Sequence, residues 1–398
     1  MEQHPYLIIM NEPLISVKNL SVDYISESAD INAVQNVSFD IYSGEVFGLV
    51  GESGSGKSTI VQAMMRILPP PALISGGKVL INNQDIMTAL PSDIIGFRWK
   101  QISIVMQSAL NALNPVLSIR EQINDVLDTH GGLNGEDANI RAEELMSLVD
   151  LDSQRLDSYP HQLSGGMKQR VVIAIALAIM PPIIIMDEPT TALDVIVERE
   201  IISKIIELRK KLGFTILFIT HDLNLLLEFV DRLAIMKNGE IVELDGVANI
   251  KKGGKHAYTK KLINAIPSAS GQREQGLISK PDSLNLSENP ILEVRNLKKV
   301  FESPGLFNKS IIKAVDGVSF EVFKGEIIGL VGESGSGKST IAKLVTRLIR
   351  PSKGSIYLHG ENKQVTESRN VPLEYRKTVQ MVFQDPFGSL NSVHTVYH

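Results

Sequence analysis

The sequence has 398 residues, enough for two ordinary domains that each bury a core. It carries 40 Lys and Arg against 45 Asp and Glu, a net charge of −5, so it lacks the broad basic excess of nucleic-acid-binding proteins, and we expect no nucleic-acid partner. Its lack of cysteine excludes disulfides, cysteine-based zinc sites and Cys-ligated iron–sulfur clusters, and favours a reducing cytoplasm.

The first part of the chain has the pattern of a sheet. Leu14–Val22 and Asn36–Ile41 alternate like strands, and Ser43-Gly44 supplies a turn before the apolar run Val46–Val50, which predicts a buried strand. The longest apolar run, Val171 to Met186, is interrupted by two prolines and is shorter than the ~20 residues of a membrane helix, so no membrane-spanning helix is predicted.

A glycine-rich turn, residues 51–59 with the sequence GESGSGKST, follows the strand Val46–Val50 and precedes a helix predicted over Ile60–Leu68. This is the spelling of a phosphate-binding loop, in which glycines let backbone N–H groups turn inward and the helix N-terminus favours negative charge. Lys57 could then reach the terminal phosphates, and the Ser58 hydroxyl could bind magnesium. We therefore predict a nucleoside triphosphate site at Gly51, Ser53, Gly54, Ser55, Gly56, Lys57, Ser58 and Thr59.

The next segments predict a strand and then an inserted helical subdomain. Ile102–Met106 reads as a strand that ends at Gln107. Two amphipathic helices follow, separated by glycines, and their apolar stripes are expected to form core; the residues that define the stripes are Ile119, Ile123, Val126 and Leu127, then Ala142, Leu145, Leu148 and Val149.

A second glycine-led helix start closes this insert. The stretch Leu163–Arg170 places Ser164, Gly165 and Gly166 at the beginning of an apolar helix predicted over 171–180. The exposed N–H groups of such a start suit an anion, but an ordinary helix N-cap explains the pattern equally well.

Two strand ends carry acid–base residues. The buried strand Ile183–Met186 ends in Asp187-Glu188, and Phe214–Thr220 reads as a strand that ends at His221. Because successive strand residues point in opposite directions, the two carboxylates can have different roles. One can bind magnesium while the other takes a proton from an attacking water. A solvated acidic turn and a structural histidine are the alternative explanations; beside a phosphate site the histidine can donate to a γ-phosphate.

The later chain predicts a repeat. Asn238-Gly239 is typical of a hairpin, and residues 268–290 read as a solvated linker. The GESGSGKST loop then recurs identically, Gln384 matches Gln107, and Phe301 matches Tyr24. The repeated loop positions predicted to bind nucleotide are Gly332, Ser334, Gly335, Ser336, Gly337, Lys338, Ser339 and Thr340. We interpret this pattern as a tandem duplication whose second copy is incomplete.

An aromatic residue ends the first predicted strand of each copy. Tyr24 could stack on an adenine ring or plug the edge of the sheet, and taken alone the edge plug is favoured. The equivalent Phe301 moves the interpretation toward base stacking.

The ordered set of motifs resembles the nucleotide-binding subunits of ABC transporters. Three segments, residues 108–115, 387–391 and His256–Leu262, resemble those of oligopeptide and dipeptide importers. The resemblance implies an α/β P-loop NTPase fold of ABC type with an antiparallel β subdomain, an inserted helical subdomain and two fused nucleotide-binding domains, as in importers of peptides or glutathione. It implies these domains: 1–11 tail, 12–267 complete nucleotide-binding domain, 268–290 linker, and 291–398 partial second domain ending after the Gln-loop.

The resemblance also assigns roles to residues. Tyr24 would stack on adenine, Ser58, Gln107 and Asp187 would arrange Mg²⁺, Glu188 would be the general base, and His221 would sense the γ-phosphate of ATP. Ser164, Gly165, Gly166 and Asp194 would contact ATP held by an opposing domain. Because the second copy lacks these later motifs, we expect complete sites only where two chains join through their first domains.

The function implied is ATP hydrolysis that energises an importer for peptides or peptide-like solutes at the cytoplasmic face of the membrane. The partners implied are integral membrane permease subunits, a solute-binding protein and a second nucleotide-binding domain. The alternatives are a soluble tandem ABC ATPase that is not coupled to transport, and a truncated product without coupled activity.

Overall fold

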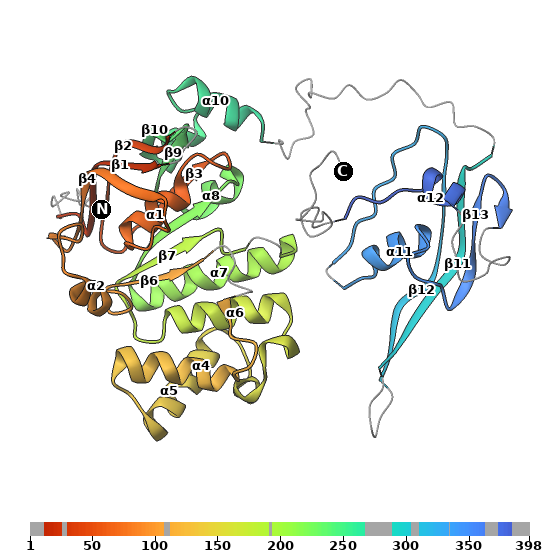
Figure 1. Ribbon diagram of the computed structural model, residues 1–398, viewed down its shortest axis with the longest axis horizontal. Coiled ribbons are helices and arrows are strands. Elements are labelled where there is room, and N and C mark those ends of the chain that lie inside the picture. The colour runs from red at the N-terminus through yellow and green to blue at the C-terminus, as the bar shows by residue number, and fades with distance from the viewer. Residues whose placement is uncertain are drawn as a thin grey trace, which may run out of the picture. The chain divides into compact units, whose positions relative to one another are not determined.

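A computed structural model of the protein describes residues 12–25, 30–106, 112–190, 193–266, 289–303, 310–333, 335–362 and 373–383. The chain divides into two compact units, Met1–Arg273 and Glu274–His398, which are considered one at a time (Figure 1).

Two sheets organise the first unit. A four-stranded antiparallel sheet has the order β2-β1-β4-β5 and comprises β1 (Ile15–Tyr24), β2 (Ile31–Ile41), β4 (Ala72–Ile81) and β5 (Gln84–Asp85). A six-stranded sheet has the order β10-β9-β3-β8-β7-β6 and comprises β3 (Val46–Gly51), β6 (Ile102–Val105), β7 (Ile183–Asp187), β8 (Thr215–Thr220), β9 (Arg232–Lys237) and β10 (Glu240–Gly246). Within it only β10 is antiparallel to its neighbour.

The strands at the centre of the larger sheet are buried on both faces, as their unbroken apolar sequences require. Alternate residues therefore enter different cores. In β3, Val46 and Val50 belong to a core shared with the helical insert, whereas Phe47 and Leu49 belong to a core shared with the antiparallel sheet. Because the side chains of each strand alternate between the two cores, the larger sheet lies between two layers. Polar residues are then found at the ends of its strands.

Helices cover the two faces unequally. Those of the first unit are α1 (Lys57–Met64), α2 (Pro91–Phe97), α4 (Ile119–Val126), the π-helix η1 (Leu127–Gly131), α5 (Gly135–Leu148), the 3₁₀ helices η2 (Ser153–Asp157) and η3 (Pro160–Gln162), α6 (Gly165–Ala176), α7 (Val195–Leu212), α8 (Leu223–Phe229), α9 (Val247–Lys251) and α10 (Ala257–Asn264). In Figure 1, α4, α5 and α6 lie together below the larger sheet, and α1 lies beside the antiparallel sheet. No helix among those the structure describes is long and apolar enough to cross a bilayer.

The ends of several helices follow from local chemistry. Ser118 and Glu121 form a capping box at the start of α4, and Gly213, with φ 79°, ends α7. Helix α1 ends at Met64, before the predicted Leu68, and Arg66 beyond it has the left-handed φ of 50°. Helix α6 begins at Gly165, earlier than the predicted apolar stretch, because the glycines themselves are helical.

The second unit has a four-stranded antiparallel sheet with the order β12-β11-β13-β14. Its elements are β11 (Leu292–Ser303), β12 (Ser310–Val322), α11 (Lys338–Val345), β13 (Lys353–Leu358), β14 (Glu361–Asn362) and α12 (Leu373–Thr378). The strands β12, β11 and β13 are arranged like β2, β1 and β4 in the antiparallel sheet of the first unit. In the part of this unit that the structure describes, the apolar stretch 327–331 forms no strand.

Candidate active site

The phosphate loop connects the end of β3 to α1. Gly56 has φ 98°, and a Cβ there would lie 2.3 Å from the carbonyl oxygen of Ala33. A Cβ at Gly51 would lie 2.5 Å from the carbonyl oxygen of Met236. Glycine is therefore required at both positions by close backbone packing. The turn is therefore tightly packed against neighbouring main-chain atoms, which leaves no room for side chains at these two positions.

The amine of Lys57 lies within this turn. Its Nζ donates to the carbonyl oxygens of Gly51 at 2.8 Å and Glu52 at 2.7 Å, and the residue is only 5% exposed. Burial lowers the pKa of the Lys57 amine, an effect that the carboxylates of Glu188 and Asp187 oppose. The sequence prediction that Lys57 belongs to the loop thus has a geometric basis, since its cation is held within the loop.

Ser58 and Asp187 meet across the first turn of α1 and the end of β7. The Ser58 hydroxyl donates to Asp187 Oδ1 at 3.2 Å, and Asp187 is 6% exposed. Burial raises the pKa of the Asp187 carboxyl, and the Ser58 hydrogen bond acts in the opposite direction. A hydroxyl and a carboxylate side by side are hard oxygen donors of the kind Mg²⁺ takes, so the residues present fit that ion.

Glu188 and His221 face each other at the ends of the neighbouring parallel strands β7 and β8. His221 Nδ1 lies 3.1 Å from Glu188 Oε1, and the Glu188 N–H donates to the Ile219 carbonyl at 2.9 Å. Glu188 has a left-handed φ of 47°, a strained conformation that turns the chain sharply after the strand. The side chain of Glu188 is 13% exposed and that of His221 is 63% exposed. A shielded carboxylate beside an accessible imidazole suits proton transfer.

The glycine-led start of α6 has separate surroundings. Ser164 caps the helix, its Oγ accepting from the Met167 N–H at 3.3 Å. A Cβ at Gly166 would lie 2.7 Å from Val197 Cγ1, so this glycine is fixed by its approach to α7. Asp194 occupies the N-cap position of α7. Ser164 therefore has the N-cap role that the sequence offered as one explanation. The starts of α6 and α7 carry Ser164, Gly165, Gly166 and Asp194, and these helices are separate from the elements of the phosphate loop.

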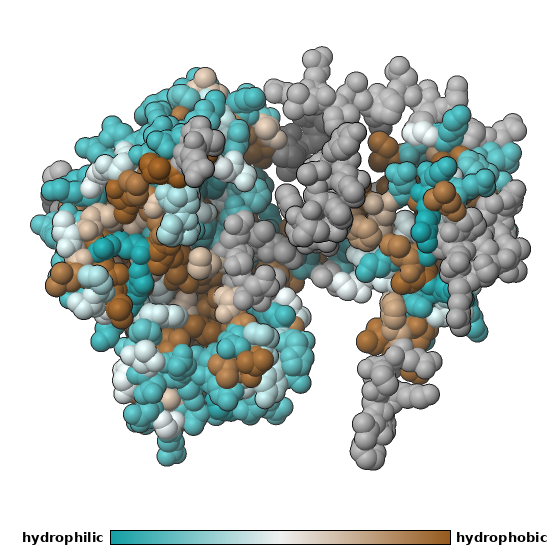
Figure 2. Space-filling model, viewed as in Figure 1, coloured by the Kyte–Doolittle hydropathy of each residue, from teal (hydrophilic) through white to brown (hydrophobic). Residues whose placement is uncertain are grey.

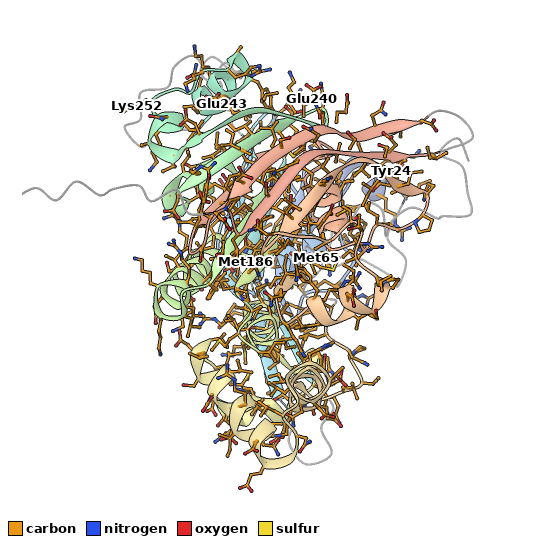
Figure 3. All side chains as sticks on the ribbon, turned by 90° about the vertical axis from the view of Figure 1, so that its left-hand side faces the viewer. Tyr24, Met65, Met186, Glu240, Glu243 and Lys252 are labelled. Atoms are coloured by element: carbon orange, nitrogen blue, oxygen red, sulfur yellow. The ribbon has the colours of Figure 1, made fainter. Side chains whose placement is uncertain are left out.

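Tyr24 is the last residue of β1 and is half-buried at the end of the antiparallel sheet (Figure 3). It pairs with Ile31 of β2 and Ala72 of β4. Both edge plugging and base stacking agree with this place, so stacking stays a prediction. Phe301, on β11 of the second unit, is 42% exposed and has the Lys299 amine 5.1 Å from its ring centre.

The second phosphate loop repeats the first in its backbone. Gly337 has φ 95°, and a Cβ there would lie 2.2 Å from the Ala314 carbonyl oxygen. The Lys338 amine donates to the carbonyls of Gly332 at 2.5 Å and Glu333 at 2.6 Å. The loop also contains Gly335, Ser336, Ser339 and Thr340. The predicted residues Gln107, Ser334 and Gln384 lie outside the described residues.

Sequence reasoning missed one partner of the phosphate loop. The Tyr258 hydroxyl, on α10, donates to Glu52 Oε1 at 2.8 Å across 206 residues of chain. The only signal in the sequence was the resemblance of the segment around Tyr258 to peptide importers, and no spacing rule connects it to the loop.

Comparison with known proteins identifies this arrangement. The family model described as "ABC transporter" matches residues 34–191 and 315–397, which include both phosphate loops. The chain belongs to the ABC transporter family. The predicted family and the ABC-type P-loop fold with an antiparallel β subdomain are therefore confirmed, and the chain is an ABC ATPase subunit that binds ATP. Whether the two matches reflect a tandem duplication stays a prediction.

Curated relatives share most of this ABC ATPase chain. The peptidoglycan transport ATP-binding protein YejF of Agrobacterium fabrum is 39% identical, and the alignment covers 96% of this chain and 68% of that protein. The glutathione import ATP-binding protein GsiA of Salmonella typhimurium is 36% identical, and the alignment covers 96% of this chain and 66% of that protein. The chain thus spans about two thirds of the length of these relatives.

A solved ABC cassette shows the likeness in three dimensions. It is a dimeric ATP-binding cassette in a post-hydrolysis state bound to ADP and Pi, 32% identical, with a TM-score of 0.53. The match covers 58% of this chain and 98% of the cassette.

Proposed function

We propose that this ABC ATPase binds Mg-ATP at the 51–59 loop and hydrolyses it to energise the import of peptides or peptide-like solutes. The observation that carries the proposal is the convergence of the Ser58–Asp187 pair and the Glu188–His221 pair at the strand edge beside the Lys57 loop. These groups supply what phosphoryl transfer to water needs, namely a phosphate cradle, oxygen donors for a metal, and a positioned base.

The proposed roles are assigned to the residues of the phosphate loop and the strand ends. The loop amides and Lys57 would hold the phosphates, and Ser58 and Asp187, together with Gln107, would hold Mg²⁺, which would neutralise charge on the phosphates. Glu188 takes the proton of the attacking water, and His221 donates to the γ-phosphate. The strained backbone of Glu188 supports this role, because strain of this kind concentrates at functional sites.

The proposed partners rest on the motif of α6 and on the relatives. Ser164 and Gly166 would contact ATP bound by a second nucleotide-binding domain, with Asp194 at the same interface; the capping of α6 by Ser164 fixes that hydroxyl at a helix N-terminus, where anions bind well. Permease subunits and a solute-binding protein complete the proposed importer, with this chain peripheral at the cytoplasmic face of the membrane. Two relatives are named for peptidoglycan transport and glutathione import.

The decisive test is Glu188→Gln. Removing the base should lower the turnover number for ATP about 10²- to 10⁴-fold while ATP still binds. Steady-state phosphate release and equilibrium binding of a fluorescent ATP analogue measure the two effects. Glu228→Gln, which changes a carboxylate in an exposed ion pair on α8, is the matched control and should leave turnover unchanged. Undiminished turnover in Glu188→Gln, or no ATP binding by the parent chain, would refute the proposal.

The partner part of the proposal has its own measurement. With hydrolysis blocked by Glu188→Gln, ATP should convert the chain to a dimer, and Ser164→Arg should prevent that dimer without lowering the affinity of the first ATP. Mass photometry with and without Mg-ATP reads the outcome. A strictly monomeric Glu188→Gln chain would contradict it. Uptake of labelled tripeptides by cells with and without this chain tests the solute class.

A further inference from the structure

Helix α10 is anchored to the end of the larger sheet by a buried carboxylate. Glu243 of β10 is 8% exposed, and its two oxygens accept from the backbone N–H groups of Lys255 at 2.6 Å and His256 at 2.9 Å. Figure 3 labels Glu243 on β10 and Lys252, the C-cap residue that follows α9 on the way to α10. The start of α10 is therefore fixed relative to β10, and its side chains have a defined direction.

One of these side chains reaches the phosphate loop. Tyr258 is 7% exposed, has the Lys237 amine 4.8 Å from its ring centre, and donates its hydroxyl to Glu52 Oε1 at 2.8 Å. Burial, together with the Glu52 carboxylate, raises the pKa of the Tyr258 hydroxyl to about 12, so it remains a donor throughout the physiological range. A hydrogen bond from a buried phenol to a carboxylate is charge-assisted and among the stronger neutral–ion contacts.

Glu52 joins this bond to the lysine of the loop. Its carbonyl oxygen accepts from the Lys57 amine at 2.7 Å, while its side chain accepts from Tyr258. A phosphate in the loop would compete for the three N–H donors of the Lys57 amine, which here reach the carbonyls of Gly51 and Glu52 and the Ser55 hydroxyl. Glu52 is therefore bonded to Lys57 through its carbonyl and to α10 through its side chain.

A second contact brings α10 to the same place. Leu262, one turn after Tyr258, lines a hollow of about 290 Å³ together with His221 and loop residues; the complete lining is Val50, Gly51, Glu52, Ser53, His221, Leu223 and Leu262. Helix α10 thus borders both the phosphate loop and the histidine proposed to sense the γ-phosphate.

The second phosphate loop has the shape of the first without a hydrogen bond from a tyrosine that the structure describes. Lys338 makes the same contacts with Gly332 and Glu333 as Lys57 makes in the first loop. Glu333, however, forms no side-chain hydrogen bond to another residue that the structure describes. The loop shape is therefore independent of a tyrosine partner, and the bond in the first unit connects two elements instead of shaping one.

We propose that Tyr258 is a positioning residue of the phosphate loop, and that through Glu52 it couples nucleotide binding at residues 51–59 to the placement of α10. The inference rests on the proposed function of the loop. Because coupling between two sites is reciprocal, a fixed α10 favours the nucleotide-bound loop to the same degree that nucleotide favours the fixed helix.

The test compares Tyr258→Phe with its parent, in the full chain carrying Glu188→Gln so that ATP persists. Phenylalanine keeps the ring against Lys237 and removes only the hydroxyl. In the parent, Mg-ATP should slow hydrogen exchange of peptides from residues 51–59 and 257–264. In Tyr258→Phe the slowing at 257–264 should fall by at least about half, and the Kd for ATP should rise about three- to tenfold, the worth of one such hydrogen bond.

Two further variants separate coupling from packing. Glu52→Gln keeps an acceptor oxygen and should retain most of the response of α10, whereas Glu52→Ala should lose it, and adding Tyr258→Phe to Glu52→Ala should cause no further loss. Tyr42→Phe, which removes a hydroxyl from a tyrosine outside the loop, is the control and should behave like the parent.

The outcomes are distinguishable. A response at 51–59 with none at 257–264 in the parent, or an equal response of α10 in Tyr258→Phe, overturns the coupling and leaves the proposed function standing. No response at 51–59 in the parent refutes the proposed function itself.

Discussion

At the scale of single residues, the carboxyl of Asp187 is in an unfavourable place without a cation. Burial raises its pKa above the ordinary value of 3.8. The folded protein then holds this proton more tightly than the unfolded chain does, so the stability contributed by the carboxyl is fully present below pH 3.8 and is lost as the pH rises through the raised folded pKa. The residue that fits a magnesium ion thus weakens the metal-free fold at neutral pH.

Asp187→Asn removes this ionisation. In buffer without magnesium, the variant should be more stable than the parent at pH 8, and its advantage should shrink as the pH is lowered to 5. Urea unfolding at the two pH values measures the difference in the free energy of unfolding. Asp93→Asn, at an exposed position in the first turn of α2, serves as the control, and any change in stability that it causes should be the same at both pH values. An advantage that grows on acidification would show that the desolvation argument is wrong.

The glycines of the phosphate loop differ in what they prevent. Gly56 combines φ 98° with the close Ala33 carbonyl, whereas Gly54 has φ 81° and open space, with no atom within 4 Å of the place a Cβ would take. Gly54→Ala therefore introduces backbone strain alone, and Gly56→Ala adds a steric overlap. We expect Gly56→Ala to lower the free energy of unfolding by about 1–3 kcal/mol more than Gly54→Ala. Equal losses in thermal unfolding would contradict the packing described for Ala33.

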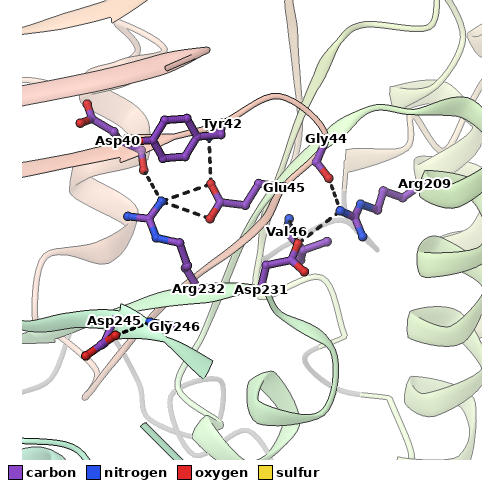
Figure 4. A network of polar contacts seen from close by, with 10 residues as sticks. All are labelled: Asp40, Tyr42, Gly44, Glu45, Val46, Arg209, Asp231, Arg232, Asp245 and Gly246. Carbon is purple, nitrogen blue, oxygen red and sulfur yellow. Dashed lines mark hydrogen bonds and ion pairs between the residues drawn. The ribbon is translucent and has the colours of Figure 1, made fainter. Parts of the chain in front are cut away.

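At the scale of elements, two ion pairs fix the beginning of β3, the strand that leads to the phosphate loop (Figure 4). Arg232 of β9 lies 3.2 Å from Glu45 Oε1, and Arg209 of α7 lies 3.2 Å from Asp231 Oδ2. Asp231 also accepts from the Val46 N–H at 2.8 Å. These contacts tie the turn before β3 to a strand and a helix that come much later in the chain.

Arg232→Ala leaves the carboxylate of Glu45, which is 8% exposed, without its cation. The loss of stability should be about 1–3 kcal/mol at pH 8, because an unpaired buried charge is costly. Burial already raises the pKa of Glu45 and Arg232 opposes that rise, so the deficit should shrink toward pH 5 as the carboxyl takes a proton.

The exposed pair Arg199–Glu228 is the matched comparison for this substitution. Both of its side chains are about half exposed, and Arg199→Ala should cost no more than about 1 kcal/mol. Adding Glu45→Gln to Arg232→Ala should recover part of the loss. Urea unfolding reads all three variants, and a double variant less stable than Arg232→Ala would contradict the argument.

The sequence predicted those elements whose pattern is local. The hairpin at Asn238-Gly239 is present, with φ of 51° and 84°, because the turn type demands those residues. The phosphate loop was predicted for the same reason, because its motif is the contiguous stretch 51–59. The Tyr258–Glu52 bond and the anchoring of β3 depend on how distant strands pair, and no periodicity reports a contact across 206 residues. The folded sheet alone brings such pairs together.

At the scale of the whole chain, the two units differ in how they bury equivalent residues. In the first unit, Val46 and Val50 of β3 are at most 1% exposed, between the parallel strands β8 and β9. In the second unit the corresponding Ile327 and Val331 are each 93% exposed. Apolar surface is visible on this unit in Figure 2, in brown. Eight apolar residues are buried in the described part of this unit, and six of them form one cluster between the antiparallel sheet and α11.

This difference predicts unequal stability for the two stretches of chain. A single buried cluster of six residues offsets little of the conformational entropy of ordering about a hundred residues, whereas residues 12–266 bury two extensive clusters. Brief trypsin treatment of the full chain should therefore cut within 291–398 first and leave 12–266 largely intact, as mass spectrometry of the fragments would show. A single cooperative calorimetric transition from an isolated 291–398 polypeptide would contradict this, because it would require a core that the exposed side chains of Ile327 and Val331 do not provide.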